Sequence, residues 1–483
     1  MERNRAILEL PLWSSSDIIC CQEFWYSCDE VFKLYVKHLE GRFRMHGLQR
    51  PGPGGSRRPD GLFMAISREW DVVHEADLDF EDAAGRCAQL LHLRRSPSSG
   101  GGDGSDGGID EVLVANVHLL FPHNEASARI RVREVHKLLS YLDSYKRRLT
   151  RPPPTLVCGD FNGEVQSKVV QFVRRCGWKC SYSAVSEQRP PPLQPPLQPP
   201  LQPPTPQRLP PSPAPLHADA ASVEPDPTLI AAARSTPVAP PRWISHLTHQ
   251  QEAKGVDYIW LLNPSEPRLP VADWTDFVFS EIAQQLGRRG FSRPSEAWDL
   301  FVSLCDPNGP SAVSGVERAL ERRRRARASP DASRSSSSAG SGDGGSSGDG
   351  GSSETRASEV PVDVVGFRRA LARLDFERGD ALGTLTHAEV ATLVSSCDRD
   401  GDGAIDAAEW RARFSAALVR LRGEGLVRDA ADNSLDLRVA DSAFHPRCLE
   451  RGKWPSAEEW GLSDHGVLSS QFVLAVPCST RCD

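Results

Sequence analysis

The sequence lacks three features that would each point to a particular class of protein. Its 483 residues contain no apolar run long enough to cross a bilayer, and the amino terminus, MERNRAILEL, has no apolar segment typical of a signal peptide. The twelve cysteines include no Cys-x-x-Cys pair, which favours reduced and mostly buried thiols. We therefore expect an intracellular protein, cytoplasmic or nuclear, with no membrane partner.

An excess of positive charge is also missing. The formal net charge is −7, which argues against a protein that coats nucleic acid through a generally basic surface. An enzyme with a local basic groove remains compatible with this charge. The length predicts one large and one smaller domain, or two to three domains in all.

Low-complexity stretches divide the chain. Residues 93–110 are rich in Gly, Ser and Asp, and residues 187–241 contain three tandem copies of LQPP. Residues 322–358 begin with RRRRAR and continue as a Ser/Gly-rich linker. Such segments cannot build a packed core, so we expect disordered insertions. The Pro-rich insertion is a candidate docking site for a groove-binding domain, and the Arg run is either a solvated helix end or a nuclear-import or nucleic-acid contact.

Between these stretches the hydrophobic patterns are orderly. We expect strands over 17–25, 62–67, 111–121 and 255–262, and helices over 4–12 and 127–148. Strands alternating with helices indicate an α/β (α+β) domain, and short β segments favour a two-sheet sandwich flanked by helices.

Polar residues stand at the ends of several predicted strands. The stretch LVCGDFN leaves an apolar run through Gly159, which we expect to turn the backbone, into Asp160 and Asn162. On its own this stretch also fits an ordinary strand followed by an Asx turn. Similar polar ends occur at Gln22-Glu23, at Asn116 and His118, at Asp257 and at Asp464-His465.

Taken in order, these groups form five motifs: Gln22-Glu23, Asn116-Val117-His118, Gly159-Asp160-Phe161-Asn162, Asp257-Tyr258-Ile259 and Ser463-Asp464-His465. This set resembles the endonuclease/exonuclease/phosphatase superfamily. It is most similar to the carbon-catabolite-repressor, Angel and nocturnin-like branch, and within it to a plant and algal subgroup that carries an inserted calcium-binding EF-hand.

The resemblance implies a metal-dependent hydrolase. Glu23 would be the ligand of Mg²⁺ or Mn²⁺, which prefer carboxylate and water oxygens. Asp160 would orient or activate the attacking water, and Asn162 would hold a phosphate oxygen with its amide. His118 would donate to the phosphate as charge develops.

The resemblance also implies a general acid/base at His465, oriented by Asp464. Asp257 would help to bind the metal or would fix the orientation of the His465 ring. The sequence departs from the family in two places. Val117 stands where the family has Thr. Met1 lies directly before the expected first helix, so this sequence does not contain the family's first strand with its Asn: either the sequence is truncated or the sheet lacks that element.

A calcium site is predicted by the stretch DRDGDGAIDAAE at 398–409. It fits the twelve-residue EF-hand loop, in which Gly403 provides the sharp turn. The expected ligands are Asp398, Asp400, Asp402, the carbonyl of Ala404, Asp406 through water, and Glu409 as a bidentate group. Flanking helices are expected, with Thr386 as the N-cap of the first. A degenerate partner loop is a candidate over 306–317, within residues 291–321.

These patterns divide the chain into a catalytic domain in three pieces, 1–186, 242–290 and 430–483, and an EF-hand module at 359–425. We expect a Mg²⁺-dependent phosphodiesterase or nuclease, specifically a 3′–5′ exoribonuclease resembling deadenylases and acting on RNA, with Ca²⁺ at the hand. The alternatives are a phosphatase acting on a small phosphorylated metabolite or dinucleotide, and an inactive calcium-binding scaffold. The sequence leaves open whether calcium regulates or only stabilises, and which oligomeric state the protein adopts.

Overall fold

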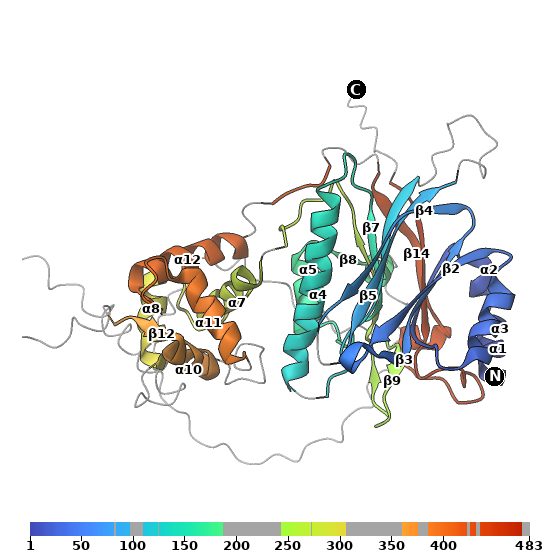
Figure 1. The fold of residues 1–483 in the computed structure, drawn as a ribbon, viewed down its shortest axis with the longest axis horizontal. Helices are drawn as coiled ribbons and strands as arrows, with labels where there is room; N and C mark the ends of the chain where they lie inside the picture. The colour runs from blue at the N-terminus through green and yellow to red at the C-terminus, as the bar shows by residue number, and fades with distance from the viewer. Residues whose placement is uncertain are drawn as a thin grey trace, which may run out of the picture.

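The computed structural model describes residues 1–81, 84–96, 110–123, 125–186, 243–271, 273–305, 360–374, 385–422, 426–430 and 435–475. Three expected segments lie outside the described residues: the insertions at 187–241 and 322–358 and the candidate loop at 306–317. Figure 1 shows a β-sandwich with helices on both outer faces and a cluster of helices beside it. Among the described residues, no helix is both long and apolar enough to cross a membrane.

One layer of the sandwich is a six-stranded sheet with the order β4-β5-β6-β7-β11-β8. Its strands are β4 (Trp70–Asp79), β5 (Cys87–Arg95), β6 (Glu111–His118), β7 (Thr155–Asp160), β11 (Asp257–Leu262) and β8 (Lys179–Cys180). Only β6 and β7 pair in parallel; the other pairs are antiparallel. Because β6 and β7 point the same way, their carboxyl ends meet at one edge of the sheet.

The opposite layer consists of two smaller sheets. One has the order β1-β3-β2, with β1 (Ile18–Trp25), β3 (Arg57–Ser67) and β2 (Phe43–Pro51), and the other pairs β14 (Leu437–His445) with β15 (Val467–Leu474). Side chains from both layers meet in one buried core, including Met64 of β3, Leu91 of β5 and Val439 of β14. The predicted two-sheet sandwich is therefore confirmed.

Helices cover both outer faces. The six-stranded sheet is covered by α4 (Glu125–Lys146) and α5 (Lys168–Arg175), whose Leu138 and Val170 belong to its buried core. The β1-β3-β2 sheet is covered by α1 (Glu2–Leu8), α2 (Leu12–Ser15) and α3 (Asp29–Leu39). Short elements complete the sandwich: α6 (Ser181–Ser186), β9 (His246–Leu247) and β10 (Ala253–Lys254).

The helical module has a hydrophobic core of its own. Its helices are α7 (Trp274–Arg288), α8 (Pro294–Cys305), α10 (Val364–Leu374), α11 (His387–Cys397) and α12 (Ala407–Leu421). The sequence analysis placed residues 242–290 wholly in the catalytic domain, and this boundary is wrong for α7. Phe279, Ile282 and Leu286 of α7 are buried with Trp410 of α12, because the apolar face of α7 turns toward the module.

Two short strands bring the calcium loop against a second segment of the module. Ala404–Ile405 (β13), within the loop, pairs antiparallel with Val362–Asp363 (β12). Helix α10 follows β12 directly, and the Asp363 side chain accepts a hydrogen bond from the backbone N–H of Gly366 at 2.7 Å. The calcium loop therefore packs against residues 362–363, directly before α10.

Strands β4 and β5 were not predicted, because the hydrophobic pattern of each is weak in the sequence. From Asp71 on, strand β4 has only exposed and half-buried side chains at the edge of its sheet, so no continuous apolar run marks it. Residues 93–110 were expected to form a loop, but β5 continues to Arg95. The apolar half of β5 lies before the Gly-rich stretch that suggested the loop.

Candidate active site

Strand register brings four of the predicted motifs to one edge of the six-stranded sheet. His118 lies opposite Asp160 in the parallel β6/β7 pair, and Asp257 lies opposite Asp160 in the antiparallel β7/β11 pair. His465, just before β15, completes the group: ligand atoms of Asp160, Asp257 and His465 all lie within 4.8 Å of one another. Glu23 of β1 approaches from the other layer, with Oε1 3.9 Å from His118 Nε2.

Gly159 allows β6 and β7 to approach closely at this edge. Its φ is 149°, and a Cβ added there would lie 1.8 Å from the carbonyl oxygen of Val117. The residue is within β7, paired with Tyr258 of β11, so the expectation that Gly159 turns the chain is wrong. The strand ends only after Asp160, and glycine is needed because a side chain would collide with β6.

Two site residues have left-handed backbone conformations that side chains other than glycine rarely adopt. Glu23 has a φ of 54° and lies at a register shift in β1, and Asn162 has a φ of 47° just after β7. Such conformations cost of order 1–3 kcal/mol each and concentrate at functional sites. Both residues are thus held in place by the surrounding fold.

His465 is oriented by Asp257. Its Nδ1 lies 3.0 Å from Asp257 Oδ2, and its Nε2 lies 4.0 Å from Asp160 Oδ2. Burial acts to lower the pKa of His465, but the Asp257 carboxylate outweighs burial and raises that pKa to about 10. The ring is therefore an imidazolium at neutral pH in this arrangement.

The expectation that Asp464 orients His465 is corrected by this geometry. The Asp464 side chain is 67% exposed, and its Oδ2 lies 3.8 Å from Nε2 of His246. The β-bridge between His246 and His465 fixes this segment in place. Asp464 therefore lies near His246, whereas the contact with Nδ1 of His465 comes from Asp257.

Asp160 is buried at the centre of the group. Burial, and then the neighbouring Asp257 carboxylate, raise the pKa of Asp160 to about 7. Its Oδ1 accepts a hydrogen bond from the backbone N–H of Asn162 at 2.7 Å, and its Oδ2 lies 3.5 Å from His118 Nε2. A carboxylate with a pKa near neutrality is suited to accept a proton.

The amide side chains at the site brace the backbone. Asn162 Nδ2 donates to the carbonyl oxygen of Leu119 at 2.9 Å, so it ties β7 to the segment after His118. Asn116 is fully buried; its Nδ2 donates to the carbonyl oxygen of Cys21 at 3.0 Å, and its Oδ1 accepts from Gln22 Nε2 at 2.7 Å. Asn116 and Gln22 thus join the two layers next to the edge that carries His118, Asp160 and Asp257, which we call the catalytic edge after the role proposed for it below.

Two residues that the sequence analysis did not assign to the site contact its histidines. The His246 ring stacks on His465 with centroids 4.1 Å apart, and burial, followed by the charge of His465, lowers the pKa of His246 to about 4. Arg86 Nη1 lies 2.9 Å from His118 Nδ1. His246 lies in the stretch SHLTH at 245–249, and neither His246 nor Arg86 belongs to one of the five motifs.

The donor set fits a hard divalent cation. Glu23 presents a carboxylate that is 68% exposed, and Asp160 and Asp257 add two more beside it. Carboxylate oxygens are the ligands that Mg²⁺ prefers, with water in the remaining positions. Oxygen ligands for a divalent cation are thus available at this edge of the sheet, from Asp160 and Asp257.

The predicted calcium loop folds with its acidic side chains gathered inward. Carboxylate oxygens of Asp398, Asp400 and Asp402 lie within 4.8 Å of one another. Asp398 accepts backbone hydrogen bonds from Gly401 at 2.7 Å and from Gly403 at 2.8 Å. The loop ends at α12, where the Asp406 side chain caps the helix.

Glu409 and the flanking helices complete this loop. The buried Glu409 carboxylate accepts hydrogen bonds from the backbone N–H groups of Arg399 and Asp406, so it bends back toward the loop. Thr386 caps α11 in a reciprocal capping box with Glu389, as the sequence predicted for the N-cap. The acidic oxygen set, including the position of Glu409, fits a Ca²⁺ ion.

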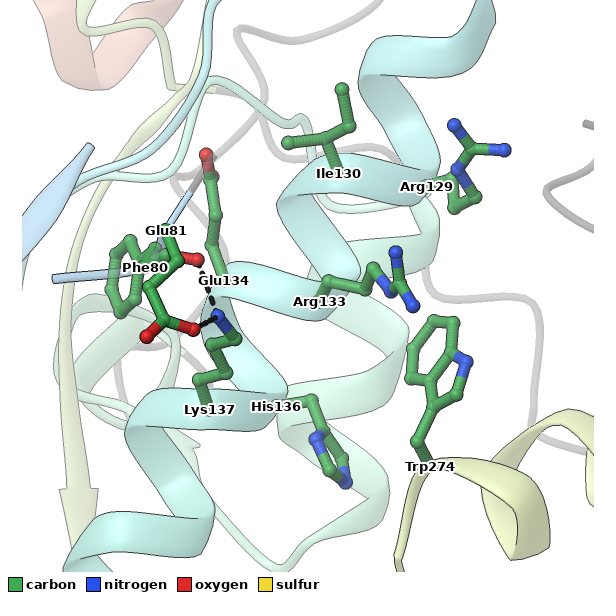
Figure 2. A pocket seen from close by; sticks show the side chains of 9 residues that line it. All are labelled: Phe80, Glu81, Arg129, Ile130, Arg133, Glu134, His136, Lys137 and Trp274. Carbon is green, nitrogen blue, oxygen red and sulfur yellow. Dashed lines mark hydrogen bonds and ion pairs between the residues drawn. The ribbon is translucent and has the colours of Figure 1, made fainter. Parts of the chain in front are cut away.

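The helical module contacts the sandwich: its helices α7 and α11 lie against α4 and α5 of the sandwich. A pocket of about 450 Å³ lies between α4 and Trp274 of α7, and the Arg133 guanidinium lies 4.9 Å from the Trp274 ring centre (Figure 2). Arg133 also pairs with Glu389 of α11 at 2.5 Å. Glu281 of α7 accepts hydrogen bonds from Lys168 and Arg175 of α5.

No protein-family model matches the sequence. The chain is 26% identical over 486 residues to an uncharacterised calcium-binding protein of Arabidopsis thaliana, and the match covers 98% of this chain and 77% of the relative.

Two solved structures can be set beside this fold. The human nocturnin catalytic domain with bound sulfate is 17% identical, with 55% of this chain and 77% of that one covered at a TM-score of 0.34. ANGEL2, a 2′,3′-cyclic phosphatase, in complex with adenosine-2′,3′-vanadate is 20% identical, with 54% and 74% covered at a TM-score of 0.34. The chain is thus similar to a plant calcium-binding protein in sequence, and its recorded structural matches include nocturnin and ANGEL2.

Proposed function

We propose that this protein is a magnesium-dependent phosphoesterase of the endonuclease/exonuclease/phosphatase superfamily. One observation carries the proposal: five segments distant in sequence bring Glu23, His118, Asp160, Asp257 and His465 to a single edge of the sandwich. Buried carboxylates and histidines are costly to gather without a use. The pKa values of Asp160 and His465 are both raised, the first by burial and the second by the Asp257 carboxylate, which outweighs burial.

The side chains divide the work of hydrolysis. Asp160, with its raised pKa, accepts a proton from the attacking water, and the His465 imidazolium donates a proton to the leaving oxygen while Asp257 holds the ring. A primary amide has two N–H donors, so Asn162 binds Leu119 with one and a phosphate oxygen with the other. A magnesium ion on Glu23 would neutralise phosphate charge.

The substrate we favour is RNA, attacked from its 3′ end, by analogy with the deadenylase-like branch. The rival substrates are a small phosphorylated metabolite or a dinucleotide. The test is an initial-rate assay with Mg²⁺ on poly(A), single-stranded DNA and NADP, with His465→Ala as the matched inactive control. Shortening of poly(A) supports the nuclease, release of phosphate from NADP supports the phosphatase, and equal background rates for wild type and control refute both.

We further propose that calcium at the EF-hand modulates this activity. The loop follows α11 directly, and Glu389 of α11 forms ion pairs with Arg129 and Arg133 of α4 at 3.7 and 2.5 Å. Helix α4 in turn holds the segment after His118, because Glu134 Oε2 accepts a hydrogen bond from the backbone N–H of Leu120 at 3.0 Å. A shift of α11 would therefore be transmitted through α4 to the segment that follows His118.

Helix α7 supplies a second connection. Asp276 pairs with Arg413 of α12 at 2.7 Å, and Glu281, further along the same helix, pairs with Lys168 of α5 at 3.3 Å. The same helix thus contacts the exit helix of the hand and a helix of the sandwich. Calcium acts on activity only if it binds two arrangements of these helices with different affinity.

A calcium titration at fixed Mg²⁺ separates regulation from stabilisation. Sensor hands bind at roughly 10⁻⁷–10⁻⁵ M, so turnover should change and saturate in that range in wild type but not in Glu409→Gln. A calcium-dependent melting temperature with flat turnover would leave the hand as a stabiliser only.

A further inference from the structure

Arg86 is buried against the catalytic edge, on the hairpin between β4 and β5. It directly precedes β5, its backbone carbonyl accepts a hydrogen bond from the N–H of Phe80, and the residue is only 7% exposed. Its Nη1 lies 2.9 Å from Nδ1 of His118, which is itself buried. The chain thus places a guanidinium on the side of the His118 ring that faces away from the carboxylates.

The chemistry of this contact determines where the His118 proton lies. A guanidinium has only N–H donors, so Nδ1 of His118 must supply a lone pair. A neutral imidazole that accepts at Nδ1 carries its proton on Nε2. That Nε2 lies 3.5 Å from Asp160 Oδ2 and 3.9 Å from Glu23 Oε1, so its N–H points to the place where the phosphate would bind.

We propose that Arg86 is a positioning residue that holds His118 in the Nε2–H tautomer, so that His118 donates a hydrogen bond to the substrate phosphate. The role in substrate binding rests on the proposed phosphoesterase function, whereas the tautomer is a property of the protein alone. A burial-driven fall in the pKa of His118 well below its ordinary value agrees with a neutral ring.

A matched control lies close by. Arg50 is another arginine near this edge, but it forms a two-pronged ion pair with Asp60, with Nε–Oδ2 and Nη2–Oδ1 distances of 2.9 and 3.0 Å. Arg50→Met removes a half-buried guanidinium without touching His118. Arg86→Lys keeps a group that can only donate, and Arg86→Met removes the donor at similar length.

The experiment records long-range ¹H–¹⁵N spectra of protein labelled at its 13 histidines, with His118→Gln used to assign the His118 signals. We expect the Nε2–H tautomer in wild type, Arg50→Met and Arg86→Lys, and a shift toward Nδ1–H in Arg86→Met. A wild-type His118 protonated at Nδ1, or an unchanged tautomer in folded Arg86→Met, overturns the proposal. The wild-type spectrum alone is decisive if Arg86→Met does not fold.

Kinetics test the role in binding. Partners that fix a functional histidine through its other ring nitrogen are worth about 10–100-fold in activity, so Arg86→Met should lose about that factor in kcat/KM, with recovery in Arg86→Lys. Combining Arg86→Met with His118→Gln should cost no more than His118→Gln alone. Additive losses overturn the positioning role. Wild-type inactivity on every phosphoester, with the expected tautomers, refutes the proposed function and leaves the Arg86 contact standing.

Discussion

The catalytic edge and the calcium loop are both clusters of acidic side chains, but they are assembled in different ways. The loop takes its acidic groups from twelve consecutive residues, and its backbone folds around them. The catalytic edge takes its groups from five segments, and Asp257 and His465, which are in direct contact, are separated by 208 positions. Contact within the loop follows from local spacing, whereas contact at the edge depends on strand register.

This difference makes the two sites sensitive to different changes. At the catalytic edge each side chain has its own role, and the contact between His465 and Asp257 joins two distant segments. One substitution there should therefore remove most activity. The loop shares its charge among several carboxylates and backbone carbonyls, so its loss should appear as a stability change that depends on calcium.

The largest effect is expected at His465. His465→Ala should lower turnover by about 10²–10⁴-fold, because it removes the group that exchanges a proton with the leaving oxygen. Asp257→Asn should also lower turnover strongly, whereas Asp464→Asn should change it little, because Asp257 makes the contact with Nδ1. Initial rates with Mg²⁺ on the best substrate provide the measurement. Equal losses in Asp257→Asn and Asp464→Asn would contradict the assigned geometry.

These residues also show how far the sequence could predict the site. The order of five motifs named Glu23, His118, Asp160 and His465, and the fold brings these residues together. It was not sufficient to choose between Asp257 and Asp464 as the partner of His465, because the residues that make the contact, Asp257 and His465, are 208 positions apart and only the fold brings them together. Arg86 could not be found at all, because only the pairing of β5 with β6 brings its hairpin beside His118.

The fold shows the same division between local and distant information. Thr386 and the calcium loop were predicted because capping and loop signals lie within a few residues. Helix α7 was assigned to the catalytic domain, although its apolar face enters the core of the helical module. Its sequence is amphipathic, and nothing within the helix indicates which of the two cores that face enters. Edge strand β4 was missed for a related reason, since its burial depends on its neighbours.

The next largest effect concerns the calcium loop. At calcium concentrations about 100 times the Kd, binding to the folded state alone stabilises it by about 2.7 kcal/mol. Glu409→Gln should remove most of this gain, because the buried Glu409 carboxylate is the expected bidentate ligand. Melting curves with calcium and with chelator measure the difference. A full calcium response in the variant would show that the ion is held elsewhere.

A smaller effect, on stability, is expected at Glu281, where the helical module meets the sandwich. Burial acts to raise the pKa of Glu281, but Arg175 and Lys168 outweigh it and lower the pKa below its ordinary value. A depressed pKa contributes stability above the ordinary pKa of about 4.3, and that stability is lost as the pH falls through the lower folded value. Glu281→Gln should therefore cost about 1–3 kcal/mol at neutral pH.

The pH dependence is the check on this contact. The difference in unfolding free energy between wild type and Glu281→Gln should shrink as the pH falls below about 4, where the wild-type carboxyl is protonated. Chemical denaturation at several pH values measures it. A difference that stays constant into acid would show that Glu281 acts through packing rather than charge.

The smallest effect is expected for the Pro-rich insertion. Replacing residues 187–241 by a short Gly/Ser linker should change stability by less than about 1–2 kcal/mol, because loop-closure entropy depends only weakly on length. Activity should be retained, since none of the site residues lies in this stretch. Melting temperature and turnover of the shortened protein test this. Loss of folded protein would show that the insertion packs against the sandwich.

The position of the catalytic metal tests the central claim most directly. Anomalous diffraction from crystals soaked in Mn²⁺, with the EF-hand disabled by Glu409→Gln, should show a peak about 2.0–2.2 Å from a Glu23 carboxylate oxygen, beside Asp160. The same peak should be absent in Glu23→Gln. A manganese ion bound away from the edge formed by β6, β7 and β11, or a peak that survives Glu23→Gln unchanged, would contradict the account.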